Sequence, residues 1–446
     1  MKNKHRFIRS SFSTQLGLIL AAAGSAVGLG NIWKFPYVAG ANGGGAFLLV
    51  YLACVLFFGA PLIMMELHIG KRTGKSTYSA FRSLSGSGRW QWLSWMCVTT
   101  AVLIMGFYFV VSGWCFSYLT EALYNGFHGM SSEALSEHFT AVTSNTPRMI
   151  LFSLLPLFLT ALVLWFDVNK GIERVSKVLM PLLFLMMIVM VVRVLMLPGS
   201  GQGLRFFFEA DFSKLTPQAV LEAMGQCFFS LSIGMGALIT YGSYMPKEQK
   251  IPRASFQVML LDTLVAVMAG LIIFPAVFSF GVNPEQGPQL VFCVLPAILQ
   301  QMSFAWAGSV LFFSLLGIAA ITSTISLMEV VVAFLCEAKS DSDRPWSRRK
   351  SVFVVSAIAI GMVLACVLLP RVFDCFDQAT TCFLMPFGAL SMSLLVGWSL
   401  RRPDERELLQ KDGFRPWMIT IFAIILRWIV PLAIMLIFLN GLGLFR

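Results

Sequence analysis

Charged residues are scarce in this chain. Asp, Glu, Lys and Arg make up only 12% of its 446 residues, whereas 57% are hydrophobic, and the mean hydropathy is +0.78. Soluble globular domains carry roughly 25% charged residues, so the composition excludes the soluble classes. Apolar runs of roughly 20 residues, long enough to cross a bilayer as a helix, recur along the sequence. The pattern predicts an all-α protein that spans the membrane many times.

The sequence also lacks the short motifs of ATP-driven, metal-dependent and enzymatic chemistry. It has no P-loop, so ATP is not the evident energy source. Its nine cysteines are scattered, without a CxxC pair or a Cys/His spacing typical of a metal site, and its four histidines lie at or near loops. The sequence shows no nucleophile–base pair or metal cluster at membrane depth, so an enzyme is not expected.

Eleven hydrophobic segments are predicted to be transmembrane helices of one domain that covers residues 1–446. They lie near residues 13–38, 46–70, 92–124, 149–166, 174–197, 217–242, 254–281, 306–336, 351–370, 376–399 and 417–441. The first of these segments is long and lacks a small-residue cleavage site, so we interpret it as a retained helix and not as a signal peptide.

The basic residues gather in alternate loops. The N-terminal segment 1–12 and the loops after the second, fourth, sixth, eighth and tenth spans are rich in Lys and Arg, whereas residues 125–147 and 282–305 contain neither. The positive-inside rule then places the N-terminus in the cytoplasm and, with an odd number of spans, the C-terminus outside. The net charge of +11 therefore reflects membrane topology, and no nucleic-acid partner is expected.

The first apolar segment contains three glycines within seven residues, Gly24, Gly28 and Gly30, followed by Asn31. Glycines weaken a helix, and a broken helix at membrane depth must have its free amides and carbonyls satisfied by something else. In transporters that partner is often the cargo and its coupling ion. The alternative is a packing face of small residues between helices. A matching break later in the chain favours the binding site.

The sixth segment has that second break, in the run from Phe228 to Gly236, which also carries the hydroxyls of Ser230 and Ser232. Spans one and six correspond if residues 13–197 and 217–399 are two five-helix repeats, and a repeat of five helices places the second copy upside down. Interrupted helices at matching positions of inverted halves indicate a binding site at the membrane midplane. The alternative is a kinked helix without a ligand.

Polar and charged side chains inside other spans are further candidates for function. Thr322 and Ser323 in the eighth span could complete an oxygen cage with carbonyls of the first break, although such hydroxyls more often bond to their own helix. Among the carboxylates inside spans, those of Glu66, Asp262, Glu329 and Asp377 stand out.

Five motifs together resemble those of a known family. They are GSAVGLGNIWKFPY from Gly24, NGGGAF from Asn42, KGIERVSKVLMP from Lys170, GQCFFSLSIGMGALITYGSY from Gly225 and AAITSTIS from Ala319. On these motifs the chain is similar, over nearly its whole length, to the neurotransmitter:sodium symporters, in particular their eleven-helix bacterial amino-acid transporters. The resemblance implies a LeuT-like fold, with a 5+5 inverted repeat, discontinuous helices 1 and 6, and residues 417–441 as helix 11.

The resemblance also implies a function and a set of site residues. The protein would import a neutral hydrophobic or aromatic L-amino acid with sodium by alternating access, across the inner (plasma) membrane of a bacterium. Substrate contacts would come from Ser25, Ala26, Leu29, Gly30, Ile104, Tyr108, Phe229, Ser232, Met235, Thr324 and Leu327. A first Na+ would bind to Ala26, Asn31, Ser230, Asp262 and the substrate carboxylate, and a second to Gly24, Val27, Ala319, Thr322 and Ser323.

Two gates and a hinge follow from the same resemblance. The outer gate would pair Lys34 with Asp377 under the aromatic lid of Phe229, and the inner gate would pair Arg9 with Glu337 near Tyr244. Gly171 and Pro181 would form a hinge in helix 5 that unwinds to let water reach the second sodium. The alternative for this segment is an ordinary helix that begins with a proline.

Three departures from the family pattern have consequences. Lys34 stands where many members have Arg, so a compact ammonium replaces a planar guanidinium that can donate two parallel hydrogen bonds. Asp262 replaces an Asn and is a fixed anion beside the first sodium, so chloride is not expected as a cofactor. No twelfth helix is present, which leaves both a monomer and a homodimer open. The rival classes are an ion channel, a proton-coupled transporter that uses Asp262 or Glu66, and a receptor that binds amino acids without moving them.

Overall fold

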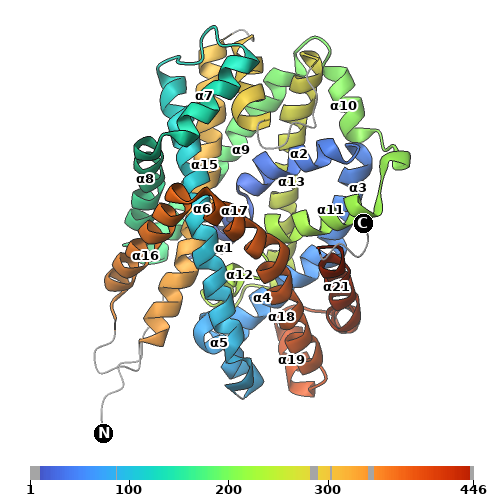
Figure 1. The fold of residues 1–446 in the computed structure, drawn as a ribbon. Helices are drawn as coiled ribbons and strands as arrows, with labels where there is room; N and C mark the ends of the chain where they lie inside the picture. The colour runs from blue at the N-terminus through green and yellow to red at the C-terminus, as the bar shows by residue number, and fades with distance from the viewer. Residues whose placement is uncertain (1–10, 87, 282–289, 302–303, 340–345, 442–446) are drawn as a thin grey trace.

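The computed structural model describes residues 11–86, 88–281, 290–301, 304–339 and 346–441, and these form a bundle of helices (Figure 1). Within the described residues, nine helices are long and apolar enough to cross a membrane. A further pair, α1 (Gln15–Ala26) and the helix Gly30–Ala41 (η1 and α2), passes the same test as one span bent by 48°. The prediction of an all-α membrane protein is confirmed.

The observed spans lie close to the predicted ones. The nine unbroken spans are Gly45–Thr73 (α3, η2, α4), Gly88–Leu123 (η3 and α6), Thr146–Leu164 (α8), Asn169–Leu195 (η4, α9), Ile251–Ser279 (α13), Ala305–Ala338 (α15), Arg348–Leu368 (α16), Pro370–Ser399 (α17, η7, α18) and Pro416–Leu439 (α20, η8, α21). The predicted sixth span is divided into α11 (Pro217–Ser230) and α12 (Ala237–Gly242).

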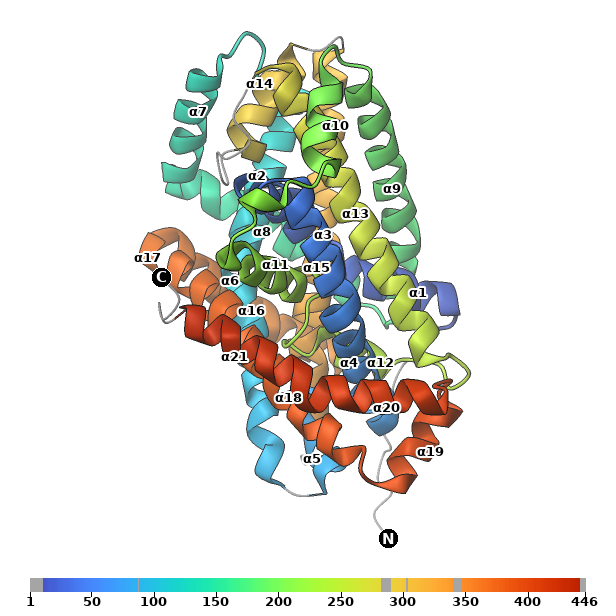
Figure 2. The ribbon, with the colours of Figure 1, turned by 90° about the vertical axis from the view of Figure 1, so that its right-hand side faces the viewer.

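The two broken helices pack among the other helices of the bundle (Figures 1 and 2), and the residues at both breaks are buried. α1 packs against α13 and α15, and α12 packs against α4 and α15. The first break begins at Val27, where the backbone becomes extended. The second occupies residues 231–236, where Ser232, Gly234 and Gly236 have φ angles of +54°, +93° and +80°. A left-handed backbone cannot continue a right-handed helix, so α11 ends here.

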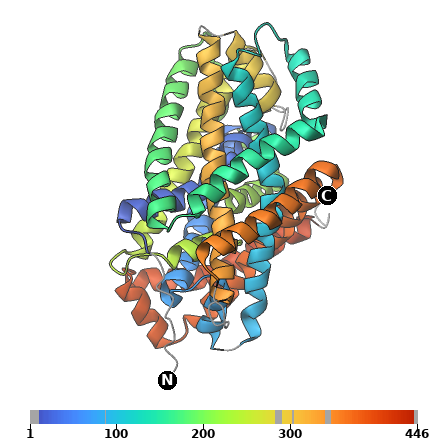
Figure 3. The same cartoon turned by 90° about the vertical axis from the view of Figure 1, so that its left-hand side faces the viewer.

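Five short helices lie between the spans and were not predicted. They are α5 (Thr77–Ser85), α7 (Ser132–Ser144), α10 (Ser200–Phe208), α14 (Leu295–Gln300) and α19 (Pro403–Lys411). A search for long apolar runs misses such segments because they are short or amphipathic. α5 and α19 lie at one end of the bundle, and α7, α10 and α14 lie at the other (Figures 1 to 3). The basic loops after the second and tenth spans belong to the α5 and α19 end.

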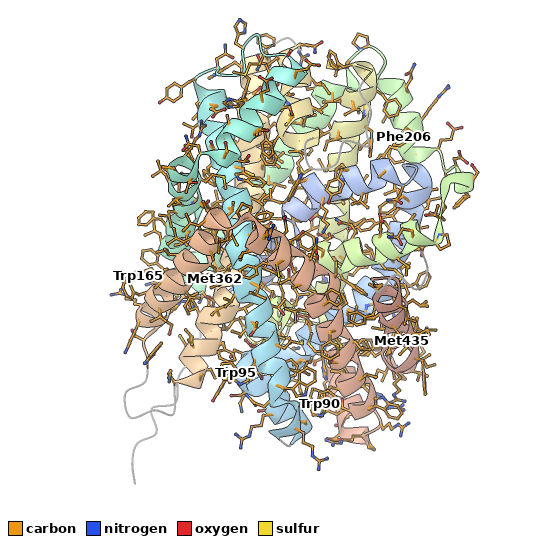
Figure 4. The ribbon with its side chains drawn as sticks, in the orientation of Figure 1. Trp90, Trp95, Trp165, Phe206, Met362 and Met435 are labelled. Carbon is orange, nitrogen blue, oxygen red and sulfur yellow. The ribbon has the colours of Figure 1, made fainter. Side chains whose placement is uncertain are left out.

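Large apolar side chains are exposed along the flanks of the bundle. Trp165 and Met435 lie on opposite flanks, and Trp95 lies toward the α5 end (Figure 4). Monomeric soluble proteins rarely expose contiguous apolar surface of this extent, whereas a lipid-facing surface requires it. The flanks therefore face lipid, and the polar residues of the spans are turned inward.

The predicted hinge in helix 5 is folded in this structure. Gly171 lies in the wide turn η4 (Asn169–Glu173), and α9 (Arg174–Leu195) continues through Pro181 without a break. The turn also holds the start of α1, because the Glu173 carboxylate accepts hydrogen bonds from Ser13 and Thr14, each at 2.7 Å. Unwinding at Pro181 stays a prediction.

We expect Gly234→Ala to destabilise the protein. A Cβ at this position would overlap the backbone carbonyl of Met385, and the φ of +93° is strained for any other residue. The strain alone costs about 1–3 kcal/mol. The matched control is Gly225→Ala in α11, where a Cβ meets nothing within 4 Å and the helix gains about 0.5–1 kcal/mol. Thermal unfolding in detergent should show a lower melting temperature for the first variant only, and equal behaviour of the two would contradict this account of the break.

Candidate functional site

Three polar side chains from the two breaks and from α13 meet in the interior. The amide nitrogen of Asn31 donates to Asp262 Oδ1 at 2.8 Å and to Ser230 Oγ at 2.9 Å. The Ser230 hydroxyl donates to Asp262 Oδ2 at 2.7 Å. All three residues are buried, and they are up to 231 residues apart in sequence. The predicted side-chain ligands of the first sodium site are therefore brought together by the fold.

The unwound backbone of both breaks is held by side chains from elsewhere. The Leu29 amide donates to the Tyr108 hydroxyl at 3.0 Å, and Ser232 Oγ donates to the Ser25 carbonyl at 2.8 Å. Gln226 Nε2 donates to the Gly30 carbonyl at 2.8 Å. Each free backbone group in an apolar interior costs several kcal/mol unless it is paired, so these bonds make the breaks tolerable.

A small cavity lies beside this cluster. Its lining combines polar backbone of the two breaks with apolar side chains. The lining residues are Ser25, Ala26, Gly28, Gly30, Ile104, Tyr108, Phe229, Ser230, Ser232, Met235, Ser323, Ser326, Leu327 and Met385. A small ligand with a charged end and an apolar end matches such a lining.

The predicted substrate contacts agree with this lining with two exceptions. Thr324 does not line the cavity, because its hydroxyl is paired with that of Thr160 in α8 at 2.7 Å and donates to the Ile321 carbonyl. Its role as a substrate contact stays a prediction. Leu29 lines the neighbouring outer cavity instead. Ser326 and Met385 line the site but were not predicted.

Phe229 separates this cavity from a second one on its outer side. The outer cavity is lined by Lys34 and Asp377, together with Tyr37, Phe107 and other residues. Lys34 and Asp377 form no ion pair in the described part of the chain. The Lys34 ammonium instead lies 4.6 Å from the centre of the Phe229 ring, as a cation–π contact. The two predicted gate residues thus share a cavity, but the lysine contacts the lid.

A second group of oxygens lies where α1 ends against α15. The Ser323 hydroxyl is 3.3 Å from the Val27 carbonyl, and a Cβ on Gly24 would lie 3.3 Å from Thr322 Cβ. The Thr322 hydroxyl donates to the Ala319 carbonyl at 3.0 Å. The five residues predicted for the second sodium therefore lie on two packed helices, and their donors are hydroxyls and carbonyls, which suit a hard cation.

The inner end of the bundle holds a buried ion pair. Arg348 donates to both oxygens of Glu329, at 2.9 and 2.6 Å, and Tyr244 Oη donates to Glu329 Oε1 at 2.7 Å. Glu337 accepts from the amide and the hydroxyl of Ser76, both at 2.7 Å, at the start of α5. Arg9, the predicted partner of Glu337, lies outside the described residues.

Some site residues were missed by the reasoning from sequence. Gln226 lies four residues before Ser230, on the same face of α11, and this i, i+4 spacing of polar residues was a usable signal. Tyr51 donates its hydroxyl to Ser230 at 3.2 Å, but nothing in the sequence links the two. Glu66, predicted as a charge inside a span and as a candidate proton carrier, accepts from the Gly234 amide at 2.7 Å near the start of α12. A carboxylate is favourable at the amino end of a helix.

The site is rich in oxygen and poor in reactive groups. Among the described residues, no three His, Cys, Asp or Glu side chains are grouped so that they could hold a metal ion. The arrangement offers hard oxygen donors, an anionic carboxylate and an apolar cavity, which are the elements for binding small cations and an amphipathic solute.

Comparison with known proteins gives the same result over nearly the whole chain. The sequence matches the sodium:neurotransmitter symporter family over residues 9–137 and 130–445. An uncharacterized sodium-dependent transporter, YhdH of Bacillus subtilis (strain 168), is 37% identical over 440 residues, which cover 97% of either protein. An uncharacterized sodium-dependent transporter of Haemophilus influenzae is 34% identical over 459 residues, covering 97% of this chain and 98% of the relative.

A solved structure shows the same fold. The crystal structure of MhsT in complex with L-phenylalanine aligns with a TM-score of 0.88 at 36% identity, and covers 97% of this chain and 100% of that chain. The expectations of a LeuT-like fold and of a non-enzymatic membrane protein are confirmed. On its sequence, its fold and its broken central helices, the chain belongs to the sodium:neurotransmitter symporter family and is a sodium-dependent transporter.

Proposed function

We propose that this protein imports a neutral, hydrophobic or aromatic L-α-amino acid together with sodium, without a need for chloride. The observation that carries the proposal is the contact between the Asn31–Ser230–Asp262 cluster and an apolar cavity lined by unwound backbone. The similarity to MhsT, which was crystallised with L-phenylalanine, supports the substrate class.

The cavity suggests how the substrate lies. Its carboxylate would face the first sodium, the amides of Leu29 and Gly30, and the Tyr108 hydroxyl. Its ammonium would face the Ser232 hydroxyl and the carbonyls of Ala26 and Phe229. Its side chain would pack among the apolar members of the lining, which include Ile104, Met235 and Leu327. Met235 is unbranched and deformable, so it suits large aliphatic and aromatic side chains.

The substrate carboxylate would couple substrate binding to sodium binding, because it would be a ligand of the first sodium. If the substrate carboxylate completes the coordination of the first sodium, each binds more tightly in the presence of the other. The Asn31 amide now turns its nitrogen toward Asp262 and its oxygen toward the Gly28 amide. A sodium at this place requires Asn31 to present its oxygen, so ion binding would also loosen the Gly28 amide at the break.

Gating is proposed at the two ends of the bundle. Lys34, Phe229 and Asp377 would close the outer end, whereas Glu337, Tyr244 and Arg9 would close the inner end. The wide turn at Gly171 and the proline at 181 would let helix 5 unwind when the second sodium leaves inward. The basic loops support a bacterial plasma membrane orientation with the N-terminus in the cytoplasm and the C-terminus outside.

The substrate should need its own carboxylate. Gly28 has no room for an acidic side chain, because a Cβ there would overlap Ser323 Oγ and lie 2.7 Å from the Tyr108 hydroxyl. In competition binding, Leu, Met, Phe, Tyr and Trp should bind about tenfold or more tightly than Glu and Lys. The charged side chain of Glu or Lys would be buried without a partner. Phenylethylamine, which is phenylalanine without its carboxylate, is the matched control, and tight binding of this amine would contradict the proposal.

Removal of one hydroxyl from the second oxygen group should weaken sodium binding. Thr322→Ala and Ser323→Ala should each weaken the free energy of sodium binding by about 1–3 kcal/mol, because a buried polar contact is lost. The measurement is a sodium titration of amino-acid binding in choline-balanced buffer. Ser356→Ala is the control, since that hydroxyl bonds only to the Val352 carbonyl of its own helix, at 2.8 Å. Unchanged titrations in both site variants would remove the second sodium from the proposal.

Asp262 should make transport independent of chloride. Its fixed negative charge lies within the first sodium site, so no external anion is needed to balance the ion. Uptake by reconstituted protein should be the same in gluconate and chloride buffers, whereas Asp262→Asn should either fail or gain chloride stimulation. Loss of wild-type uptake in gluconate would assign the charge balance to another group.

The same carboxylate supports a further step. When sodium leaves, Asp262 is a buried anion without its cation, and uptake of a proton would relieve that cost. The proton would then leave outward during the return of the empty protein. An internal pH change that accompanies uptake in wild type, but not in an active Asp262→Asn variant, would support this antiport.

A further inference from the structure

Three arginines gather around the last turn of α18, at the junction of the tenth span, α19 and the eleventh span. Arg427 Nε donates to the Gly397 carbonyl at 2.5 Å, and Arg406 Nε donates to the Leu400 carbonyl at 3.0 Å. The Arg401 guanidinium lies 4.0 Å from the centre of the Trp398 ring. Every one of these partners is uncharged, so none neutralises a guanidinium.

The local charge is therefore strongly positive. Glu405 is engaged with Arg72, at 3.4 Å, and lies 3.7 Å from His68. In the described part of the chain, none of the three arginines has a carboxylate within ion-pair distance. Asp404, next to Glu405, is exposed and is in no ion pair of the described residues.

Arg427 is the member whose position requires an explanation. It lies halfway along the span Pro416–Leu439, where an arginine is costly unless its charge is paired or reaches a polar layer. Its Nη2 atom is buried and has no hydrogen-bond partner among the described residues. Its stem approaches the backbone of Gly397, where a Cβ would lie 3.1 Å from Arg427 Cγ.

The surface around the arginines is of the lipid-facing kind. Trp398 is 41% and Trp428 is 63% exposed, and their rings lie 6.2 Å apart. Ile424 and Ile429 are exposed on the same helix as Trp428. The helices α18 and α20–α21 run along the outside of the bundle (Figure 2). Trp398 lies in the last turn of the tenth span, and tryptophans are enriched where spans meet the lipid headgroups. An arginine reaches that level by extending its side chain.

We propose that this junction binds the phosphate of an anionic phospholipid. A phosphodiester offers the negative charge and the acceptors that the three guanidiniums lack, and guanidinium–phosphate bonds are among the strong charge-assisted ones. The acyl chains lie against the exposed apolar residues of α18 and η8. A bound lipid then bridges the tenth and eleventh spans at the end of the bundle that carries the basic loops.

The test counts lipids on the purified full-length protein by native mass spectrometry. Phosphatidylglycerol, phosphatidylcholine with the same chains, and inorganic phosphate are titrated separately. Arg401→Gln and Arg406→Gln are the test variants, since both residues are exposed. Arg89→Gln is the control, because Arg89 is an exposed arginine of another basic loop, and its loss changes the net charge equally.

We expect the first phosphatidylglycerol to bind about tenfold more tightly than phosphatidylcholine. Each test variant should weaken phosphatidylglycerol binding about fivefold, because one basic residue near a membrane surface contributes about that much. The control should leave this affinity unchanged. Equal affinity for the two lipids, or an equal loss in the control, would overturn the site. Phosphate that competes at the lipid's own concentration would show a free-anion site and would overturn the assignment to lipid.

Discussion

The pairing of the buried Asp262 carboxylate is the constraint on which the rest of the site depends. A carboxylate in the middle of a lipid-embedded bundle is costly unless hydrogen bonds or a cation compensate it. Its partners, Asn31 and Ser230, come from the two broken helices, whereas Asp262 itself is held by the long, continuous α13. One charge therefore joins both breaks to a rigid element, and any cation that enters acts on all three at once.

Breaks in two central helices are tolerable because their backbone is satisfied by side chains from other spans. The Leu29 amide, the Gly30 carbonyl and the Ser25 carbonyl have partners in α6 and around the second break, and the Gly234 amide has Glu66 of α4. This explains why polar residues occur singly within otherwise apolar segments. Tyr108, Gln226, Ser232 and Glu66 each bond to backbone at or beside a break, and residues of both breaks line one cavity.

Different interactions lie on the outer side of that cavity and at the inner end of the bundle. On the outer side, Lys34 rests on the Phe229 ring, and a cation–π contact is worth about 0.5–2 kcal/mol. On the inner side, the two-pronged bond between Arg348 and Glu329 is buried, and breaking such a pair costs about 3–5 kcal/mol. Lys34 lacks the planar, forked guanidinium with which an arginine holds a carboxylate.

Length, hydropathy and glycine placement sufficed to predict the all-helical membrane fold, the approximate bounds of the spans and the positions of both breaks. These properties are local: about 20 apolar residues in lipid form a helix, and glycines weaken that helix where they stand. The motifs from Gly24, Gly225 and Ala319 then identified which polar residues to examine. The short helices such as α5 and α19 were missed because they have no long apolar run.

Other features were decided only by the tertiary structure. Tyr51 reaches Ser230 from 179 positions away, Lys34 contacts Phe229 and not Asp377, and the hydroxyl of Thr324 faces Thr160 and not the cavity. Periodicity shows which residues share a helix face, but it does not show how helices are rotated and packed against one another. Those rotations follow from the contacts of all the spans together, and they determine which side chains meet at the site.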